Sequence, residues 1–260
     1  ANVPESMASR GFVKSMTFWL RSVMKYLDVY TAVSEAGADY FTNMIEDPIT
    51  IVPNGVDLKK FSQAAADKKP LDVEEPTILF IGRLEGRKGV KHLLSAFQAL
   101  VEDNHHAKLL IVGDGPEREK LELLAEDLKL ANISFLGHVS EKRKLELLAE
   151  ADLMVSPAIF GESFGIVLLE AMATNTVCIA GDNPGYEGVM QGIGALSLIN
   201  PEDTKEFARR MHMLIHEKQL RTLWLNWSSR YVKQFDYPLV VKQYEKVYED
   251  ALKSHGHLRK

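Results

Sequence analysis

The chain has 260 residues, a net charge of −5, and 46% hydrophobic and 26% charged residues. This balance suits one large or two modest packed domains, and the acidic charge gives no general support for nucleic-acid binding. The single cysteine, Cys178, excludes an internal disulfide and fits a reducing compartment. It lies in an apolar strand candidate, so we expect a buried, inert thiol. No apolar run approaches the roughly 20 residues of a transmembrane helix.

The first segment predicts an amphipathic helix. The sequence begins without an initiator Met or the apolar region of a signal peptide, so we expect a fragment of a longer protein. Apolar residues recur at helical spacing from Phe12 to Leu27, and a basic stripe lies elsewhere on the same helix. Such a helix either packs on a sheet or lies on a membrane surface with anionic lipid. If its sheet is absent, its apolar stripe predicts self-association or a partner.

Short elements follow this helix. A strand is predicted over 29–33, and Ser34 caps a helix that runs to about Asn43. A second strand over 49–52 stops at the turn Pro53-Asn54-Gly55. The polar, charged residues of 62–75 predict a linker or a solvated loop.

From Thr77 onward, strands and helices alternate regularly. The alternation implies right-handed βαβ units and a parallel sheet with helices on both faces. The aromatic tail after Gln219 predicts two packing helices divided by Pro238. The predicted strands are 78–81, 108–112, 133–136, 153–158, 177–180 and 195–199, and the predicted helices are 89–101, 117–128, 141–149, 163–174 and 203–216.

Two carboxylates bracket an apolar stretch between two of these strands. Glu162 and Glu170 are eight residues apart, and a helix over 163–174 would place Glu162 at its N-terminus. The carboxylates would then be separated by about 12 Å of helix rise and could hold two hydroxyl groups of one elongated ligand. The helix N-terminus would favour an anion between them. The alternative is a core helix with an acidic cap and one solvated Glu.

The loop from Gly82 to Gly89 combines three glycines with three cations. Arg83, Arg87 and Lys88 could bind phosphate oxygens where the loop opens a helix, which describes a diphosphate site. The alternative is an ordinary exposed basic turn. The loop is not a P-loop, because Gly follows Lys88 and the spacing differs.

Two further turns follow the next strands. Gly113-Asp114-Gly115-Pro116 begins like G-x-G-x-x-G, but Arg118 replaces the third glycine, which argues against a dinucleotide site. This turn either lines a ligand cleft or is purely structural. In Phe135 to Val139, His138 is either an exposed loop residue or a general base. Because all these motifs follow strands of a parallel sheet, we expect them to meet at one edge.

The ordered motifs resemble those of retaining GT-B glycosyltransferases of the family-4 type. The resemblance covers Val29 to the end and includes the E-x7-E stretch, the G-R-x-x-x-x-K-G loop and the G-D-G-P turn. Locally, Gly161 to Leu168 and the tail Asp236 to Tyr248 look closest to the bacterial phosphatidylinositol mannosyltransferases. Asn183-Pro184-Gly185 and Thr174-Asn175-Thr176 depart from the usual family residues, and both departures leave the donor sugar open.

The resemblance implies roles for individual residues. Arg83 and Lys88 would grip the donor diphosphate and stabilise its charge as it leaves, Glu162 would orient the donor sugar, and Glu170 would hold the ribose. Backbone N–H groups of Phe164 and Gly165 would meet the sugar hydroxyls. The other expected donor-binding residues are Gly82, Gly113, Asp114, Gly115, Leu136, Gly137 and Ile166.

The resemblance also implies an α/β, Rossmann-like C-terminal half of a GT-B fold. Its expected parts are 1–55, a remnant of the acceptor-side domain; 56–235, the donor-binding domain; and 236–260, a helix that crosses back. No D-x-D motif of metal-dependent GT-A enzymes occurs, so we expect no metal and no cofactor. A family member of this kind would act in the cytoplasm, at the inner face of the cell membrane.

The implied function is transfer of a hexosyl group from a nucleotide-diphosphate sugar to a lipid or glycan acceptor. Mannose is favoured, with GDP-mannose preferred to UDP-glucose, and a missing N-terminal domain or a partner subunit would complete the protein. This portion alone is expected to bind nucleotide but to transfer sugar poorly. The alternatives are a non-catalytic nucleotide-sugar-binding subunit or sensor, a UDP-sugar-dependent glucosyltransferase, and a GT-B epimerase.

Overall fold

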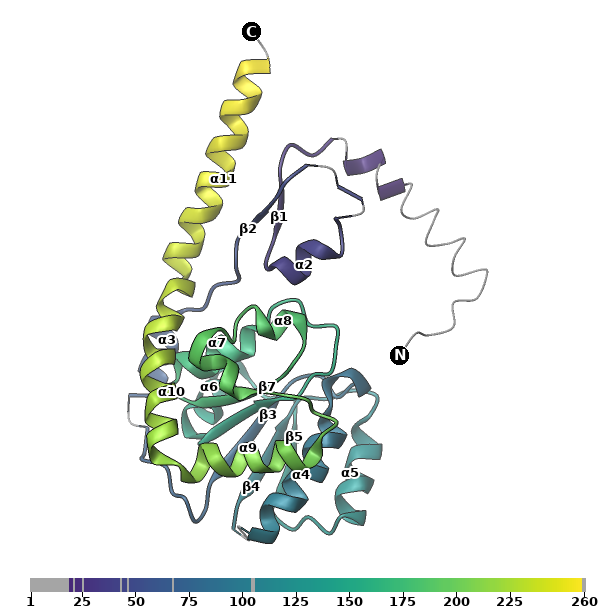
Figure 1. Ribbon diagram of the computed structural model, residues 1–260, viewed down its shortest axis with the longest axis vertical. Coiled ribbons are helices and arrows are strands. Elements are labelled where there is room, and N and C mark those ends of the chain that lie inside the picture. The colour runs from purple at the N-terminus through teal and green to yellow at the C-terminus, as the bar shows by residue number, and fades with distance from the viewer. Residues whose placement is uncertain are drawn as a thin grey trace.

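The computed structural model describes residues 19–20, 22–24, 26–42, 44–45, 47–66, 68–103 and 106–258, the last five without their side chains. These residues form a six-stranded sheet of order β5-β4-β3-β6-β7-β8 and a two-stranded sheet of order β1-β2. Every strand pair in both sheets is parallel. The chain is therefore an α/β protein with a large and a small parallel sheet (Figure 1).

The large sheet and its helices follow the βαβ alternation that the sequence predicts. Its strands are β3 (Thr77–Ile81), β4 (Lys108–Val112), β5 (Ile133–Gly137), β6 (Leu153–Ser156), β7 (Val177–Gly181) and β8 (Leu198–Ile199). Its helices are α3 (Leu58–Ala64), α4 (Val90–Asp103), α5 (Arg118–Asp127), α6 (Glu141–Glu150), α7 (Ile166–Ala173), α8 (Pro184–Glu187), α9 (Thr204–His216) and α10 (Lys218–Tyr231), with 3-10 turns η1 (Gly86–Lys88), η2 (Gly192–Ser197) and η3 (Val232–Phe235).

Helices cover both faces of the large sheet. α4 packs against α5 and α9 on one face, and α6 packs against α3 and α7 on the other. Parallel strands need such crossovers, and their side chains are then apolar in both directions. All residues of β6 and β7 are buried accordingly. The confirmed arrangement brings the carboxyl ends of the strands to one edge.

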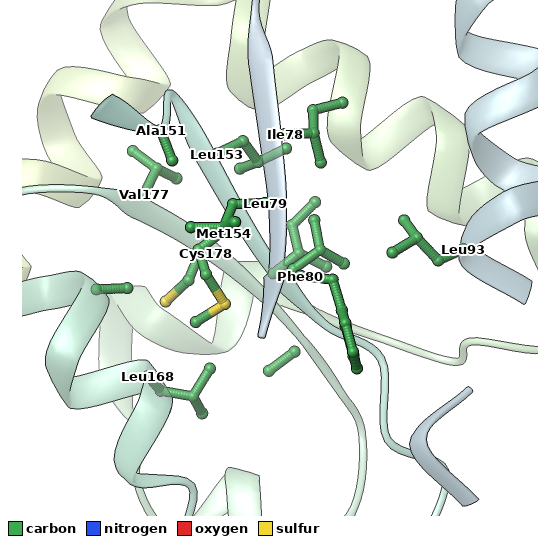
Figure 2. Close-up of a cluster of buried hydrophobic side chains, with 14 of the residues drawn as sticks. Ile78, Leu79, Phe80, Leu93, Ala151, Leu153, Met154, Leu168, Val177 and Cys178 are labelled. Carbon is green, nitrogen blue, oxygen red and sulfur yellow. The ribbon is translucent and has the colours of Figure 1, made fainter. Parts of the chain in front are cut away.

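The core lies between these layers. Figure 2 shows Leu79 and Met154 of the central strands together with Leu93 of α4 and Leu168 of α7, and all four belong to one cluster of buried residues. Cys178 belongs to this cluster and is a free, buried cysteine, as predicted. Burial raises the pKa of its thiol above the ordinary range, which keeps it protonated and unreactive.

The helix that carries Glu170 is shorter than predicted. It begins at Ile166 instead of Ser163, because Gly165 has a φ of 97° and this left-handed conformation interrupts a right-handed helix. Glu162 therefore lies in the loop before α7 and not at a helix N-terminus. The predicted separation of the two carboxylates along one helix is wrong.

Several other boundaries also differ from the prediction. The expected linker from Ser62 starts inside α3, because Phe61 of that helix is buried in the core. The strand expected from Ala195 is mostly the 3-10 turn η2, and only Leu198–Ile199 pair with β7. Pro238 lies in the first turn of α11 (Tyr237–Leu258), where its missing N–H is tolerated, and η3 forms the break instead.

The small sheet pairs β1 (Tyr30–Ala32) with β2 (Ile49–Ile51). Ser34 caps α2 (Glu35–Asp39) by accepting a hydrogen bond from the Gly37 N–H, but this helix ends well before Asn43, which lies outside the described residues. Of the predicted helix over 12–27, residues 19–20 and 22–24 are helical, and Trp19 and Leu27 are exposed. Phe12 and Met16 lie outside the described residues.

Two chain segments connect the small sheet region to the large one at a single crossing. Val56 forms a parallel bridge with Asp236, and the Val56 N–H donates to the Phe235 carbonyl at 2.8 Å. The Tyr237 N–H donates back to the Val56 carbonyl at 3.1 Å. From this crossing α11 runs past the small sheet (Figure 1) and leaves a pocket of about 560 Å³ between them. Among the described residues, no helix is both long and apolar enough to cross a bilayer.

Candidate active site

A pocket of about 470 Å³ opens at the carboxyl ends of the first strands of the large sheet. We call it the sheet-edge pocket. Its residues come from the loops after β3, β4 and β5 and from the helix α6. It is lined by Ile81, Gly82, Arg83, Val112, Gly113, Asp114, Gly115, His138, Val139 and Lys144.

The first two of these loops are joined by backbone contacts. The Leu84 N–H donates to the Asp114 carbonyl at 2.9 Å, and the Gly82 N–H donates to the Val112 carbonyl at 3.0 Å. Gly113 has a φ of 123°, and a Cβ there would lie 1.9 Å from the Gly82 carbonyl oxygen. Only glycine allows the two loops to approach this closely. The predicted G-D-G-P turn therefore builds one wall of the pocket.

Glu162 lies between two cations of the basic loop. Its Oε1 accepts hydrogen bonds from Arg87 Nη1 and Lys88 Nζ, both at 2.6 Å, and the carboxylate is only 13% exposed. Arg87 Nη1 also donates to the Gly161 carbonyl at 3.1 Å. Burial opposes the charge on Arg87, but hydrogen bonds to Glu85 and Glu162 raise its pKa overall. The loop after β3 thus fixes the loop after β6 through charge-assisted hydrogen bonds.

Glu85 connects the remaining cation of the loop to this cluster. Its Oε1 pairs with Arg83 Nε and its Oε2 with Arg87 Nε, both at 2.9 Å. Arg83 is 68% exposed at the sheet-edge pocket, so most of its guanidinium is open to a ligand. Lys88 does not line that pocket and lies on Glu162 instead. The structure therefore places the two predicted diphosphate-binding cations in different surroundings.

Glu170 is partly buried, with its side chain 13% exposed, and is paired with Lys144, which lines the sheet-edge pocket. The Lys144 Nζ donates to Glu170 Oε1 at 2.7 Å and lies 3.3 Å from Glu141 Oε2. Burial raises the pKa of Glu170, and the hydrogen bond and charge of Lys144 oppose that rise. Glu170 and Glu162 do not themselves line the sheet-edge pocket.

The residues that follow Glu162 divide into buried and exposed groups. Phe164 is buried edge-to-face on Phe235, with ring centroids 5.9 Å apart. Gly165 caps α7 with its left-handed backbone, and Ile166 is exposed at the start of the helix. The Phe164 side chain therefore anchors the loop, and any ligand contact from Phe164 and Gly165 must come from the backbone.

The turn after β5 contributes differently from the prediction. His138 and Val139 line the pocket, whereas Leu136 and Gly137 do not. Leu136 is exposed, and the Gly137 carbonyl accepts a hydrogen bond from the Gly113 N–H at 2.8 Å. Gly137 thus joins the second and third loops rather than facing a ligand.

Asp114 and Arg118 stabilise the second turn. Asp114 Oδ1 accepts a hydrogen bond from the Gly115 N–H at 2.7 Å, and this bond is the main reason that the pKa of Asp114 is lowered. Arg118 Nη1 lies 3.4 Å from Asp114 Oδ2, and Nη2 donates to the Phe135 carbonyl at 3.4 Å. Arg118 therefore joins the turns after β4 and β5 at the position where a dinucleotide fingerprint has glycine.

Two site residues were not assigned roles in the sequence. Arg87 stood out only as one of three cations in the basic loop, and nothing in the spacing pointed to Glu162. Lys144 gave no signal beyond its place in a charged helix, three residues after Glu141. Both pair with acidic residues far away in the chain, so only the folded structure shows the pairing.

The small sheet region touches the loop that carries Glu162. Ser34 Oγ donates to the Ser163 carbonyl, next to Glu162 in the chain. A second pocket of about 400 Å³, mostly apolar, lies beside this contact and is lined by Met24, Tyr30, Thr31, Ala32, Val33, Gly37, Tyr40, Phe41, Ile45, Ile49 and Ser163. Glu162 is thus next in the chain to a residue that lines this apolar pocket, and Arg87 and Glu85 link it to Arg83 of the sheet-edge pocket.

Solved structures with this fold are glycosyltransferases of the GT-B class. Sucrose-phosphate synthase from Thermosynechococcus elongatus aligns with a TM-score of 0.79 at 22% identity and covers 97% of this chain and 65% of its own. The Anabaena protein HepE, solved with UDP and glucose, aligns with a TM-score of 0.78 at 20% identity over 92% of this chain and 68% of its own. At this identity the likeness establishes the fold alone.

The sequence comparison establishes the family. The model for glycosyl transferases group 1 matches residues 61–226, and the chain belongs to this glycosyltransferase family. The phosphatidyl-myo-inositol mannosyltransferase of Mycolicibacterium smegmatis is 35% identical over 220 residues, which are 84% of this chain and 56% of that protein. The D-inositol 3-phosphate glycosyltransferase of Corynebacterium jeikeium is 28% identical over 216 residues, 78% of this chain and 52% of that one. The chain thus spans little more than half the length of these relatives.

Proposed function

We propose that this chain is the donor-binding portion of a retaining, metal-independent glycosyltransferase. It would bind a nucleotide-diphosphate sugar, with GDP-mannose favoured over UDP-glucose, and take part in transferring the hexosyl group to a lipid or glycan acceptor. The observation that carries the proposal is the pairing of Glu162 with Arg87 and Lys88, in a cluster that Glu85 links to Arg83 of the sheet-edge pocket. A carboxylate beside two cations can orient sugar hydroxyls while the cations stabilise a departing diphosphate.

The charges around the pocket support this assignment. Arg83 presents a largely open guanidinium to the sheet-edge pocket, and a guanidinium binds phosphate oxygens in pairs. Lys88 has three N–H donors and uses one on Glu162, so it can also bind an anion. The cations bound to Glu162 would thus take up charge on the diphosphate, with no step assigned to a metal.

The preference for mannose and a lipid acceptor is drawn from the relatives. Five relatives named phosphatidyl-myo-inositol mannosyltransferase are 33–35% identical to this chain. Their names describe those proteins, and HepE, with the same fold, was solved with UDP and glucose. Measured nucleotide preference is therefore the direct way to separate a mannosyltransferase from a UDP-sugar-dependent glucosyltransferase.

A thermal-shift series with GDP, UDP, GDP-mannose, UDP-glucose and NAD tests the donor. A ligand at about 100 times its Kd adds roughly 2.7 kcal/mol, which raises the Tm by on the order of 5–10 °C for a domain of this size. A shift with GDP and GDP-mannose alone supports the proposal. A rise in Tm with UDP and UDP-glucose alone would assign a different donor but would keep the assignment as a glycosyltransferase. No shift with any nucleotide overturns the proposed function.

Matched variants test the role of the basic loop. Lys88→Met should weaken nucleotide binding by about 10- to 100-fold, because a charged hydrogen bond contributes about 1.5–3 kcal/mol. Lys91→Met is the control, since Lys91 is exposed on α4 one turn further on. Equal affinities in both variants would place the ligand elsewhere. The chain could also bind GDP-mannose without hydrolysing it or transferring its mannose, even when an acceptor-side partner is present. That result would favour the alternative of a non-catalytic nucleotide-sugar sensor.

We infer that an acceptor-side body completes the protein. Residues 1–55 would be the remnant of that body, 56–235 the donor-binding domain and 236–260 a helix that crosses to it. A two-stranded parallel sheet rarely exists without further strands and helices, and Trp19, Tyr26, Tyr40 and Phe41 around it are exposed. A missing N-terminal domain or a partner subunit would cover this surface. Size-exclusion chromatography tests for self-association, and binding of a hydrophobic dye tests for an exposed apolar surface. A monomer that does not bind the dye would contradict this inference.

The same apolar surface suggests a place of action. We propose the cytoplasm, at the inner face of the cell membrane, where a lipid acceptor would be reached. In a flotation assay, vesicles of anionic lipid should bind more of the chain than neutral vesicles do. The reason is that attraction between basic side chains and anionic lipid adds to the binding of the apolar surface. Absence of the chain from both vesicle fractions would contradict membrane contact.

A further inference from the structure

Hydrogen bonds hold the backbone on both sides of Glu162. The Gly161 carbonyl, just before it, accepts from Arg87 Nη1 at 3.1 Å, and the Ser163 carbonyl, just after it, accepts from Ser34 Oγ. Arg87 lies in the basic loop of the large sheet, whereas Ser34 follows β1 of the small sheet region. Two separate parts of the molecule therefore fix the loop between β6 and α7, residues 157–165, which we call the Glu162 loop.

The Ser34 hydroxyl is placed for this contact by the helix that it caps. Ser34 is the N-cap of α2, and its Oγ accepts a hydrogen bond from the Gly37 N–H at 2.9 Å. A hydroxyl group has one donor and two acceptor positions, so it can cap α2 and donate to the Ser163 carbonyl at the same time. Ser34 is only 7% exposed, so the donor is enclosed by protein. The hydroxyl is thus fixed in direction as well as in position.

The other side of the Glu162 loop is packed against α8. A Cβ on Gly185 of α8 would lie 2.1 Å from the Glu162 carbonyl oxygen, so this helix lies directly against the loop. The Tyr186 ring packs against Gly165, where an added Cβ would lie 2.7 Å from it. Helices α2 and α8 are themselves in contact (Figure 1). The loop is therefore held by α8 on the large-sheet side and by Ser34 on the small-sheet side.

A carboxylate that orients a sugar needs its backbone fixed as well as its head. Arg87 and Lys88 both hold Oε1 of Glu162 at 2.6 Å, but both are long side chains that can follow a displaced loop. Functional groups must be held within about 0.5 Å of the productive geometry by the residues that support them. A donor on the Ser163 carbonyl restrains a movement of the backbone that the two cations do not.

We propose that Ser34 is a positioning residue, which holds the backbone after Glu162 so that the carboxylate is aimed at the sugar of the donor. The inference rests on the proposed function, because that function assigns the donor sugar to Glu162. Ser34 lines neither the sheet-edge pocket nor the apolar pocket, so it acts through the loop. Loss of its donor should therefore weaken recognition of the sugar and spare recognition of the nucleotide.

Three substitutions separate the contact to the loop from the cap of α2. Ser34→Gly removes the donor but keeps most of the cap, because Gly is a fair N-cap residue and Ala is a poor one. Ser34→Ala removes both, and Ser34→Thr keeps a hydroxyl for both. Asp203→Ala is the matched control, because Asp203 caps α9 through the Glu206 N–H and lines neither pocket.

Calorimetry compares each nucleotide sugar, GDP-mannose and UDP-glucose, with its nucleoside diphosphate. Ser34→Gly and Ser34→Ala should weaken binding of the nucleotide sugar by about 2- to 10-fold, the worth of one hydrogen bond, and should leave binding of the diphosphate unchanged. Ser34→Thr and Asp203→Ala should bind both ligands as the wild-type chain does. A larger loss in Ser34→Ala than in Ser34→Gly would mark a capping role and overturn the proposal, as would equal losses for sugar and diphosphate.

A double-mutant cycle tests the route through the carboxylate. If Ser34 acts through Glu162, Ser34→Gly should cause no further loss of nucleotide-sugar affinity in a chain that already carries Glu162→Gln. Equal losses with and without the carboxylate would overturn the proposal, because Ser34 would then act on the ligand by another route.

Hydrogen exchange followed by mass spectrometry needs no nucleotide. Peptides that cover residues 159–168 should exchange faster in Ser34→Gly and Ser34→Ala and at the wild-type rate in Ser34→Thr, because the loop loses a contact that restrains its opening. Unchanged exchange in Ser34→Gly overturns the proposal even if binding is weakened. If the wild-type chain binds neither nucleotide sugar, the proposed function and the sugar assignment fail together. The exchange then decides separately whether Ser34 holds the Glu162 loop.

Discussion

Replacing Gly113 by Ala tests how the sheet-edge pocket is built. The Ala Cβ would lie 1.9 Å from the Gly82 carbonyl oxygen, and the φ of 123° is one that residues with a Cβ rarely adopt. The unfavourable backbone costs about 1–3 kcal/mol, and forcing two packed loops apart costs about 1–3 kcal/mol more. We therefore expect Gly113→Ala to lower the free energy of unfolding by about 2–6 kcal/mol.

Urea unfolding followed by circular dichroism measures this loss. Gly86→Ala is the matched control, because Gly86 lies in the loop after β3, which Gly113 approaches, and a Cβ at Gly86 meets nothing within 4 Å. It should change the free energy of unfolding by less than about 0.5 kcal/mol, as surface substitutions usually do. Gly113→Ala should also weaken nucleotide binding, since the loops it separates carry Arg83 and Asp114. A Gly113→Ala variant as stable as Gly86→Ala would refute the close-approach argument.

Three further results are expected from buried side chains. By urea unfolding, Trp224→Phe should lower the free energy of unfolding by less than about 2 kcal/mol and Trp224→Ala by about 3–5 kcal/mol. The buried indole N–H has no acceptor among the described residues, so removing it breaks no hydrogen bond. Equal losses in the two variants would contradict this reasoning. Burial, with the charge of Arg221, lowers the pKa of Lys68 in the folded chain to about 7. Above that pH the unfolded chain binds more protons than the folded one, so the free energy of unfolding should rise toward about pH 10, by at most about 1.4 kcal/mol per pH unit. Lys68→Met should remove this rise and Lys69→Met, at an exposed position, should not. Ellman's reagent should modify Cys178 only as fast as the protein unfolds, and rapid labelling of the native chain would show an accessible thiol.

The alternating part of the fold could be predicted because each unit of it is local. β4 occupies Lys108–Val112, the predicted residues, since an apolar run bounded by polar turns identifies a buried strand without reference to the rest of the chain. The start of α7 could not be predicted this way. Phe164 continues the apolar pattern of the helix, yet its ring is anchored on Phe235 from the far end of the domain, and Gly165 takes a left-handed backbone.

In the candidate site, too, features set by local sequence could be predicted and contacts between distant segments could not. Motif spacing pointed to Arg83, Lys88, Glu162 and Glu170 as candidates, because the segments that carry them follow strands that all end at one edge. The pairing among them depends on contacts between distant segments. Glu162 meets Arg87 across 75 residues and Glu170 meets Lys144 across 26, and no local pattern specifies such pairs.

The crossing at Val56 and Asp236 has a mechanical consequence. The body of the large sheet is entered and left through two neighbouring backbone segments, bridged side by side, and Gly55 is packed so closely on the Tyr237 ring that a Cβ there would lie 2.5 Å from it. The two segments are separated by about one strand spacing, on the order of 5 Å. They therefore form a single pivot, at which the segment from the small sheet and the start of α11 both join the large-sheet body. For the same reason, a short linker between residues 56 and 236 would close the large-sheet body into a circle with little distortion.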